Sequence, residues 1–299
     1  MMNRLLLALE GSEGDEAAFS EAQRIAGPGA EIHLVHVVPS RPVAVGTPLL
    51  GMVDAVRDEP VAAGASGADA HLSESFPSSY SEIFPEEIPQ LQDRAVRYLA
   101  NLRKKVGTTG GRDIVWTGDP ADSILDVALQ FNVDMIVMSR HGRSRFARWL
   151  LGSVTDEVLK RSQLPILLVR SDVPIRSQPL RRILVPMDGA PESRSILSAV
   201  KPLAARLNVE LHLLEVLNAD QPWHGVGEVC HDLTTSGVAW RFARVRGDAT
   251  DEILRYAVAR RADLIAMSVP HRLGRNLAKA LLAASDLPVL LQHPVIHAS

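Results

Sequence analysis

Short runs of apolar residues recur along the chain and alternate with amphipathic stretches. Three of these runs have the aliphatic composition of strands that are buried on both faces, namely Arg4 to Leu9, Glu31 to Val38 and Val133 to Met138. Helical periodicity lies between them, at about Asp15 to Ala26 and at Glu86 to Lys105, where Leu91, Ala95, Leu99 and Leu102 share one side. Strands that alternate with helices predict a parallel sheet with helices on both faces.

The same order of elements occurs twice. Arg4 pairs with Arg182 and Gly11 with Gly189 at an offset of 178 residues, and Glu31 to Leu34 pairs with Glu210 to Leu213 at 179. Further on, Asp119 pairs with Asp248 and Asp134 with Asp263 at 129, and Leu164-Pro165 pairs with Leu287-Pro288 at 123. Asp119 and Asp248 each have another Asp three residues on, which predicts a capped helix start in both copies. The chain is therefore a duplicated domain.

The changes of offset locate the differences between the copies. The fall from 179 to 129 gives the first copy 50 additional residues, at about 40–89, and these are rich in Pro, Gly, Ala and Ser. A lid over a ligand is one hypothesis for this insertion, and a partly disordered surface segment is the other. The fall from 129 to 123 leaves the second copy 6 residues shorter in a later loop, and its middle helix is predicted to be short or absent. We expect two domains, 1–171 and 180–299, joined by a polar linker with two prolines.

The stretch from Val133 to Val169 carries the candidate chemistry. A buried strand is followed by a basic loop with Gly142, Arg143, Arg145 and Arg148, and a helix is predicted to start at about Ser153, with Ser153 as its N-cap and Asp156 three residues on. A helix start offers unpaired N–H groups to an anion, and glycine lets a phosphate approach the backbone. Phosphate binding is one interpretation, and a capped helix after a basic loop is the other.

One stretch of the chain reads Met138-Ser139-Arg140-His141-Gly142 and then, after nine intervening residues, Gly152-Ser153-Val154-Thr155. It resembles the nucleotide loop of universal stress proteins, usually written G-x2-G-x9-G-[S/T]. Ser139 replaces the first glycine of that pattern. The resemblance implies a doubly wound α/β fold with strand order 3-2-1-4-5 in each of two tandem five-stranded sheets. Its ligand site lies where the strand order reverses, beyond the carboxyl ends of strands 1 and 4.

The resemblance also implies the residues of an adenine-nucleotide site in the first copy. The Pro-x-Asp at the end of strand 1 corresponds to Ala8 and Glu10, and the adenine contact of strand 2 to Val37. Met138 corresponds to a residue lining the pocket. The positions of the loop and the phosphate contacts are Ser139, His141, Gly142, Arg143, Gly152, Ser153, Val154 and Thr155. The implied ligand is ATP, with or without Mg²⁺.

The second copy keeps Pro186 and Asp188 but departs from the pattern of the loop. Gly152 falls on Arg275 and Ser153 on Asn276, and the loop is shorter. We therefore predict that the second copy does not bind a triphosphate in the usual way.

Composition narrows the class of protein. A net charge of −3 does not favour nucleic-acid binding, and a hydrophobic content of 46% is that of a soluble globular protein. A single cysteine, Cys230, excludes an internal disulfide and a multi-Cys metal site. No apolar run approaches the roughly 20 residues that cross a bilayer, and the N-terminus does not have the pattern of a signal peptide. We expect a cytoplasmic protein with no membrane or nucleic-acid partner.

The sequence favours a regulator over an enzyme. Efficient phosphoryl transfer needs a positioned nucleophile and metal-binding carboxylates, and Glu10 is the one obvious acid near the loop. His33 and His212 repeat between copies and are expected to pack rather than bind metal. The hypotheses are an ATP-binding stress regulator read by an unknown protein partner, a weak ATPase, and a ligand-free adaptor. The resemblance further implies that the last strands of the two copies pair within the chain; homodimerisation is left open.

Overall fold

The structure is a computed structural model of the 299-residue chain, and it describes residues 3–12, 14–27, 29–39, 53–54, 85–106, 110–140, 152–188, 190–217, 227–269 and 273–294. Most of the insertion at 40–89 lies outside these residues, and so do His141, Gly142 and Arg143 and the neighbouring Arg145 and Arg148. The predictions made for them therefore stay predictions.

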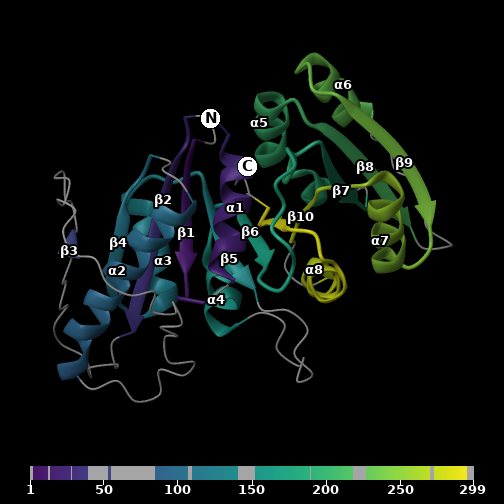
Figure 1. The fold of residues 1–299 in the computed structure, drawn as a ribbon. Helices are drawn as coiled ribbons and strands as arrows, with labels where there is room; N and C mark the ends of the chain where they lie inside the picture. Colours follow the sequence, from purple (N-terminus) through teal and green to yellow (C-terminus); the bar gives the residue numbers. More distant parts are fainter. Residues whose placement is uncertain are drawn as a thin grey trace, which may run out of the picture.

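The strands form one 11-stranded sheet in the order β3-β4-β2-β1-β5-β6-β11-β10-β7-β8-β9 (Figure 1). Within it, β4-β2-β1-β5-β6 and β9-β8-β7-β10-β11 each have the expected order 3-2-1-4-5. The bounds are β1 Arg4–Leu9, β2 Glu31–Pro39, β3 Val53–Asp54, β4 Asp113–Gly118, β5 Met135–Arg140, β6 Ile166–Arg170, β7 Arg182–Met187, β8 Glu210–Leu217, β9 Trp240–Arg246, β10 Leu264–Ser268 and β11 Val289–Gln292. The sequence did not predict β3, which pairs antiparallel with β4.

Helices cover both faces of the sheet, because strand residues alternate between two hydrophobic clusters. One cluster contains Leu5, Leu7 and the apolar sides of α1, α2, α5 and α6, and the other contains Leu6, Ala8 and those of α3, α4, α7 and α8. The bounds are α1 Asp15–Ala26, α2 Ile88–Val106, α3 Pro120–Gln130, α4 Ser153–Arg161, α5 Leu197–Leu207, α6 Gly227–Thr235, α7 Ala249–Arg260 and α8 Leu273–Ala284, with short 3-10 turns at Pro85–Glu87 and Pro191–Arg194. The middle helix of the second copy, α6, is short but present.

The two copies join edge to edge. β11 pairs antiparallel with β6, with Val289 opposite Leu168 and Leu291 opposite Ile166, so each copy covers the exposed edge of the other. This is the pairing within the chain that the resemblance implied. It turns the two predicted sheets into one.

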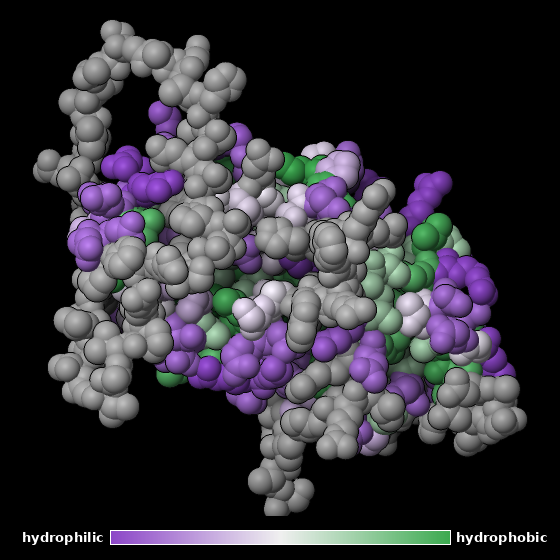
Figure 2. Space-filling view, turned by 90° about the horizontal axis from the view of Figure 1, so that it is seen from below, coloured by the Kyte–Doolittle hydropathy of each residue, from purple (hydrophilic) through white to green (hydrophobic). Residues whose placement is uncertain are grey.

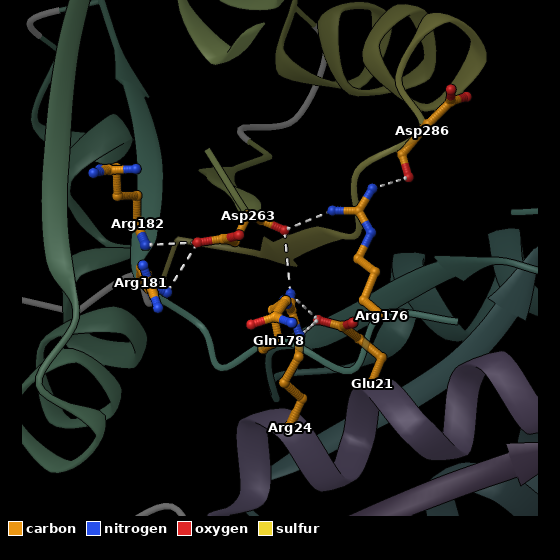
Figure 3. A network of polar contacts seen from close by, with 8 residues as sticks. All are labelled: Glu21, Arg24, Arg176, Gln178, Arg181, Arg182, Asp263 and Asp286. Carbon is orange, nitrogen blue, oxygen red and sulfur yellow. Dashed lines mark hydrogen bonds and ion pairs between the residues drawn. The ribbon is translucent and has the colours of Figure 1, made fainter. Parts of the chain in front are cut away.

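Polar contacts reinforce the junction, as Figure 3 shows. Arg24 of α1 forms an ion pair with Glu21 at 2.7 Å and donates to the carbonyl oxygens of Gln178 and Asp263, and Arg176 of the linker donates to the carbonyl oxygens of Asp263 and Asp286. Burial raises the pKa of the Glu21 carboxyl, and the adjacent Arg24 opposes this effect. The linker and α1 are thereby fastened to the second copy.

The repeated aspartates that aligned the copies have structural roles. The Asp134 carboxylate accepts from the backbone N–H groups of Asn3 and Arg4, and the Asp263 carboxylate accepts from those of Arg181 and Arg182. In the same way, Asp119 and Asp248 accept from N–H groups in the first turns of α3 and α7, as predicted. Asp134 and Asp263 thus hold the start of the first strand of each copy, and Asp119 and Asp248 hold the start of a helix.

Two predicted boundaries were wrong. β5 was expected to end at Met138-Ser139, but it continues to Arg140, and Ser139 and Arg140 are buried and pair with Val169 and Arg170 of β6. The N-cap of α4 is Gly152, not Ser153, because the Asp156 N–H already donates to the Gly152 carbonyl oxygen at 2.9 Å. Ser153 is therefore the first residue inside the helix, and its hydroxyl is not the cap.

Candidate functional site at the carboxyl ends of β1 and β5

The strand order reverses at β1, which lies between β2 and β5. Ala8 of β1 stands directly opposite Met138 of β5 in the parallel register. In sheets of this kind, the crevice beyond the carboxyl ends of the strands at the reversal is where ligands bind. Figure 2 views the molecule from the end toward which the β1 arrow points in Figure 1, and both hydrophilic and hydrophobic residues reach the surface there.

Four of the apolar residues named from the sequence gather on one face of this end. Ala8, Val37 and Met138 belong to the hydrophobic cluster beneath α3 and α4, and Val154 of α4 packs against it from above. Their side chains alternate onto the same face because each occupies the matching position of its strand. They form an apolar floor at the reversal of strand order.

Polar groups surround this floor. Glu10 follows β1 directly and is exposed, and Gly152 and Ser153 are exposed at the start of α4, while Thr155 is buried in its first turn. No side chain among the described residues caps α4, so its first N–H groups are not taken up in that way. A Cβ added at Gly152 would meet no described atom within 4 Å, and φ at Gly152 is −56°. The backbone of the protein thus does not itself require glycine at this position.

Ser139 is not part of this group. It points to the opposite face of β5, where its hydroxyl donates to the Asp15 carboxylate at 3.3 Å. Its neighbour Arg140 reaches the second copy and donates to the carbonyl oxygens of Leu282 and Ser285 at the end of α8, at 2.6 and 2.8 Å. Burial lowers the pKa of Arg140 to about 10, so the guanidinium stays charged at neutral pH.

Asp15 is a polar residue at this site that sequence reasoning missed. Its carboxylate is fully buried and accepts from the N–H groups of Gly11 and Ser12 at 2.8 and 3.2 Å and from the Tyr98 hydroxyl at 2.5 Å. Burial raises the pKa of Asp15 to about 6, against the opposing effect of these hydrogen bonds. One signal was present in the sequence: Asp15 aligns with Ser193, 178 residues on, so an acid replaces a hydroxyl in the repeat.

The repeated histidines have structural surroundings. His33 is buried against Phe131 and accepts from the Arg112 N–H at 3.2 Å, and His212 lies 2.8 Å from the Glu210 carboxylate. Among the described residues, no group of three His, Cys, Asp or Glu side chains is arranged to hold a metal ion. Cys230 is a free thiol on α6. None of the helices in the described ranges has the length and apolar character needed to cross a bilayer.

The second copy differs at the equivalent place. Asp188 is exposed at the end of β7 and accepts from the Ala190 N–H at 3.0 Å. α8 already begins at Leu273, three residues before Asn276, the position that aligns with the start of α4. The position equivalent to Gly152, which is Arg275, therefore lies inside α8.

Comparison with known proteins gives a consistent result. Residues 1–170 match the sequence model of the universal stress protein family. The universal stress protein YxiE of Bacillus subtilis is 28% identical over 173 residues, which cover 57% of this chain and 100% of that protein. A universal stress protein of Methanocaldococcus jannaschii is 35% identical over 92 residues, which cover 30% of this chain and 57% of its own length. A crystal structure of a universal stress protein from Archaeoglobus fulgidus aligns over 99% of this chain and 100% of its own with a TM-score of 0.70; at 19% identity this shows the shared fold.

Proposed function

We propose, from the premise that this chain belongs to the universal stress protein family, that its first copy binds an adenine nucleotide and that the protein is a regulator rather than an efficient catalyst. The observation that carries the proposal is the start of α4. It lies at the reversal of strand order, it is exposed, and among the described residues no side chain caps it and no atom lies within 4 Å of a Cβ added at Gly152. A helix start of this kind favours phosphate oxygens through its N–H groups and its dipole.

The residues present suit the parts of such a ligand. The N–H groups of Ser153, Val154 and Thr155 and the hydroxyl of Ser153 would hold phosphate. The apolar floor of Ala8, Val37 and Met138 would face the base, and Glu10 has a carboxylate for the sugar or base. His141, Gly142 and Arg143 are proposed phosphate contacts on the sequence resemblance alone. Any Mg²⁺ would arrive with the nucleotide, since no cluster of metal ligands occurs among the described residues.

Titration with ATP by calorimetry tests the proposal. We expect one site per chain, and we expect Gly152→Val combined with Ser153→Ala to weaken binding by about 10- to 100-fold, because hydrogen bonds to a charged group contribute about 1.5–3 kcal/mol. The fold should survive, since the added side chain meets no described atom and removal of a favourable N-cap costs about 1 kcal/mol.

Asn276→Ala, at the aligned position of the second copy, is the matched control and should leave ATP binding unchanged. Absence of binding to the wild type would remove the nucleotide proposal and favour a ligand-free adaptor. ATP turnover that is lost in Glu10→Ala would instead favour a weak ATPase.

A further inference from the structure

A buried carboxylate lies directly behind the proposed nucleotide site. Asp15 joins three elements there: the turn after β1 through the N–H groups of Gly11 and Ser12, α2 through Tyr98, and β5 through Ser139. Gly11 has φ of 81°, which turns its N–H and that of Ser12 toward a common point. Consecutive backbone N–H groups of this kind form a nest for an anion, and here the side chain of Asp15 occupies it.

Among the described residues, no cationic side chain forms an ion pair with the Asp15 carboxylate. From the turn, Glu10 adds a second negative charge, and on α1 the Glu16 carboxylate is turned to Lys105 at 2.5 Å. On β2, burial lowers the pKa of His36 to about 4, and on α2, burial and the proximity of Asp15 raise the pKa of Tyr98, so both are neutral near pH 7. The cations at the ends of β5 and β6 bind elsewhere, Arg140 to α8 and Arg170 to Asp172 and Asp286.

The second copy provides a comparison within the same chain. Ser193 stands at the position of Asp15, and Ser268 at that of Ser139. The Ser193 hydroxyl donates to the Ala190 carbonyl oxygen at 2.7 Å, and the Ser268 and Ser195 hydroxyls lie 2.6 Å apart. In the second copy, the contacts equivalent to those of Asp15 are therefore made by neutral hydroxyl groups, so the fold does not require a charge at this point. The buried acid occurs in the copy with the phosphate-binding features.

We propose that Asp15 is a positioning residue of the first-copy nucleotide site and that its ionisation makes nucleotide affinity depend on pH. The inference rests on the proposed function. Asp15 fixes the turn that begins at Glu10 and the end of β5 that follows Met138, so it holds two of the proposed ligand-binding segments together. When ionised, it also places a negative charge behind the region where phosphates would bind. Protonation removes that charge and leaves the carbonyl oxygen to accept from the backbone.

The test compares ATP affinity at pH 7.5 and pH 5.5 in the wild type and in Asp15→Asn. The wild type is expected to gain affinity relative to the variant by about three- to tenfold at the lower pH, because a buried charge is screened less than an exposed one and the ligand carries several negative charges. The ATP phosphates also titrate in this range, but both proteins bind the same ligand, so the ratio of their affinities isolates Asp15. At pH 7.5, Asp15→Asn should bind more tightly than the wild type.

A second readout does not depend on affinity. The ¹³C shift of the Asp15 carboxyl should titrate with a midpoint near pH 6 in the free protein, and saturating ATP should raise that midpoint. Glu16→Gln, a change in the neighbouring carboxylate that faces Lys105, is the matched control and should leave the pH profile of binding unaltered. Asp15→Ser, which copies Ser193, serves if the asparagine variant does not fold.

The outcomes separate the two proposals. ATP binding with a wild-type to Asp15→Asn affinity ratio that does not change with pH would overturn the role of Asp15 and leave the nucleotide site intact. A carboxyl midpoint that saturating ATP does not move would do the same. No ATP binding at either pH would refute the proposed function itself.

Discussion

Asp15→Asn is expected to raise the free energy of unfolding by about 2–3 kcal/mol at pH 7.5. Burial raises the pKa of Asp15 from 3.8 to about 6, and each unit of such a difference between folded and unfolded states corresponds to about 1.4 kcal/mol. Asparagine can keep the contacts: its oxygen accepts from Gly11, Ser12 and Tyr98, and its amide donates to Ser139. The gain is somewhat less than the full electrostatic value because neutral hydrogen bonds are weaker than charged ones.

The pH dependence has a defined sign. The folded state holds the Asp15 proton more tightly than the unfolded state, so the wild type is relieved of the ionisation cost below about pH 4. That cost grows as the pH rises and is fully present above about pH 6. The difference in unfolding free energy between Asp15→Asn and the wild type should therefore increase between pH 4 and about pH 6.5 and then stay constant. Urea denaturation at several pH values measures it.

Glu16→Gln is again the matched control, because Glu16 and Lys105 form a partly exposed pair of the kind that contributes about 0–1 kcal/mol. If Asp15→Asn were less stable than the wild type at pH 7.5, the hydrogen bonds to the ionised form would outweigh its burial. The folded-state pKa of Asp15 would then lie below its ordinary value.

The order of the elements along the chain was predictable because the duplication repeats it, whereas the order of the strands within the sheet came from the resemblance to universal stress proteins. Residues that repeat at constant offsets, such as Asp119 with Asp248 and Asp134 with Asp263, mark the same points of two identical frameworks, and the structure places each of these aspartates in the same local role. The resemblance to the family named Ala8, Val37 and Met138, and the structure places all three in one hydrophobic cluster. Strand alternation explains why they share a face of the sheet.

The parts that were missed depend on contacts between distant segments. Asp15 has the pattern of an ordinary acid in a first helical turn, but its carboxylate also accepts from Tyr98, 83 residues away, and from Ser139, 124 residues away. Ser139 and Arg140 looked like the start of a polar loop because polar residues end most buried strands. Their partners lie on α1 and α8, and one sequence without its fold does not reveal those partners.

Arg140→Met is expected to lower the free energy of unfolding by about 3 kcal/mol. The substitution keeps an apolar side chain in the buried space but removes both donors to Leu282 and Ser285, and each carbonyl oxygen left without a partner costs about 1–3 kcal/mol. The loss includes a favourable position for a cation, because the guanidinium lies at the carboxyl end of α8.

Arg161→Ala is the control for the loss of an arginine as such, since its ion pair with Asp122 is exposed to solvent and should contribute little to stability. Urea denaturation of the two variants distinguishes the cases, and equal small effects would mean that the end of α8 does not depend on Arg140. A large effect for Arg140→Met alone would give the second copy a physical role despite its altered loop. Its last helix would hold the end of β5, two residues beyond Met138, and so help to shape the site of the first copy.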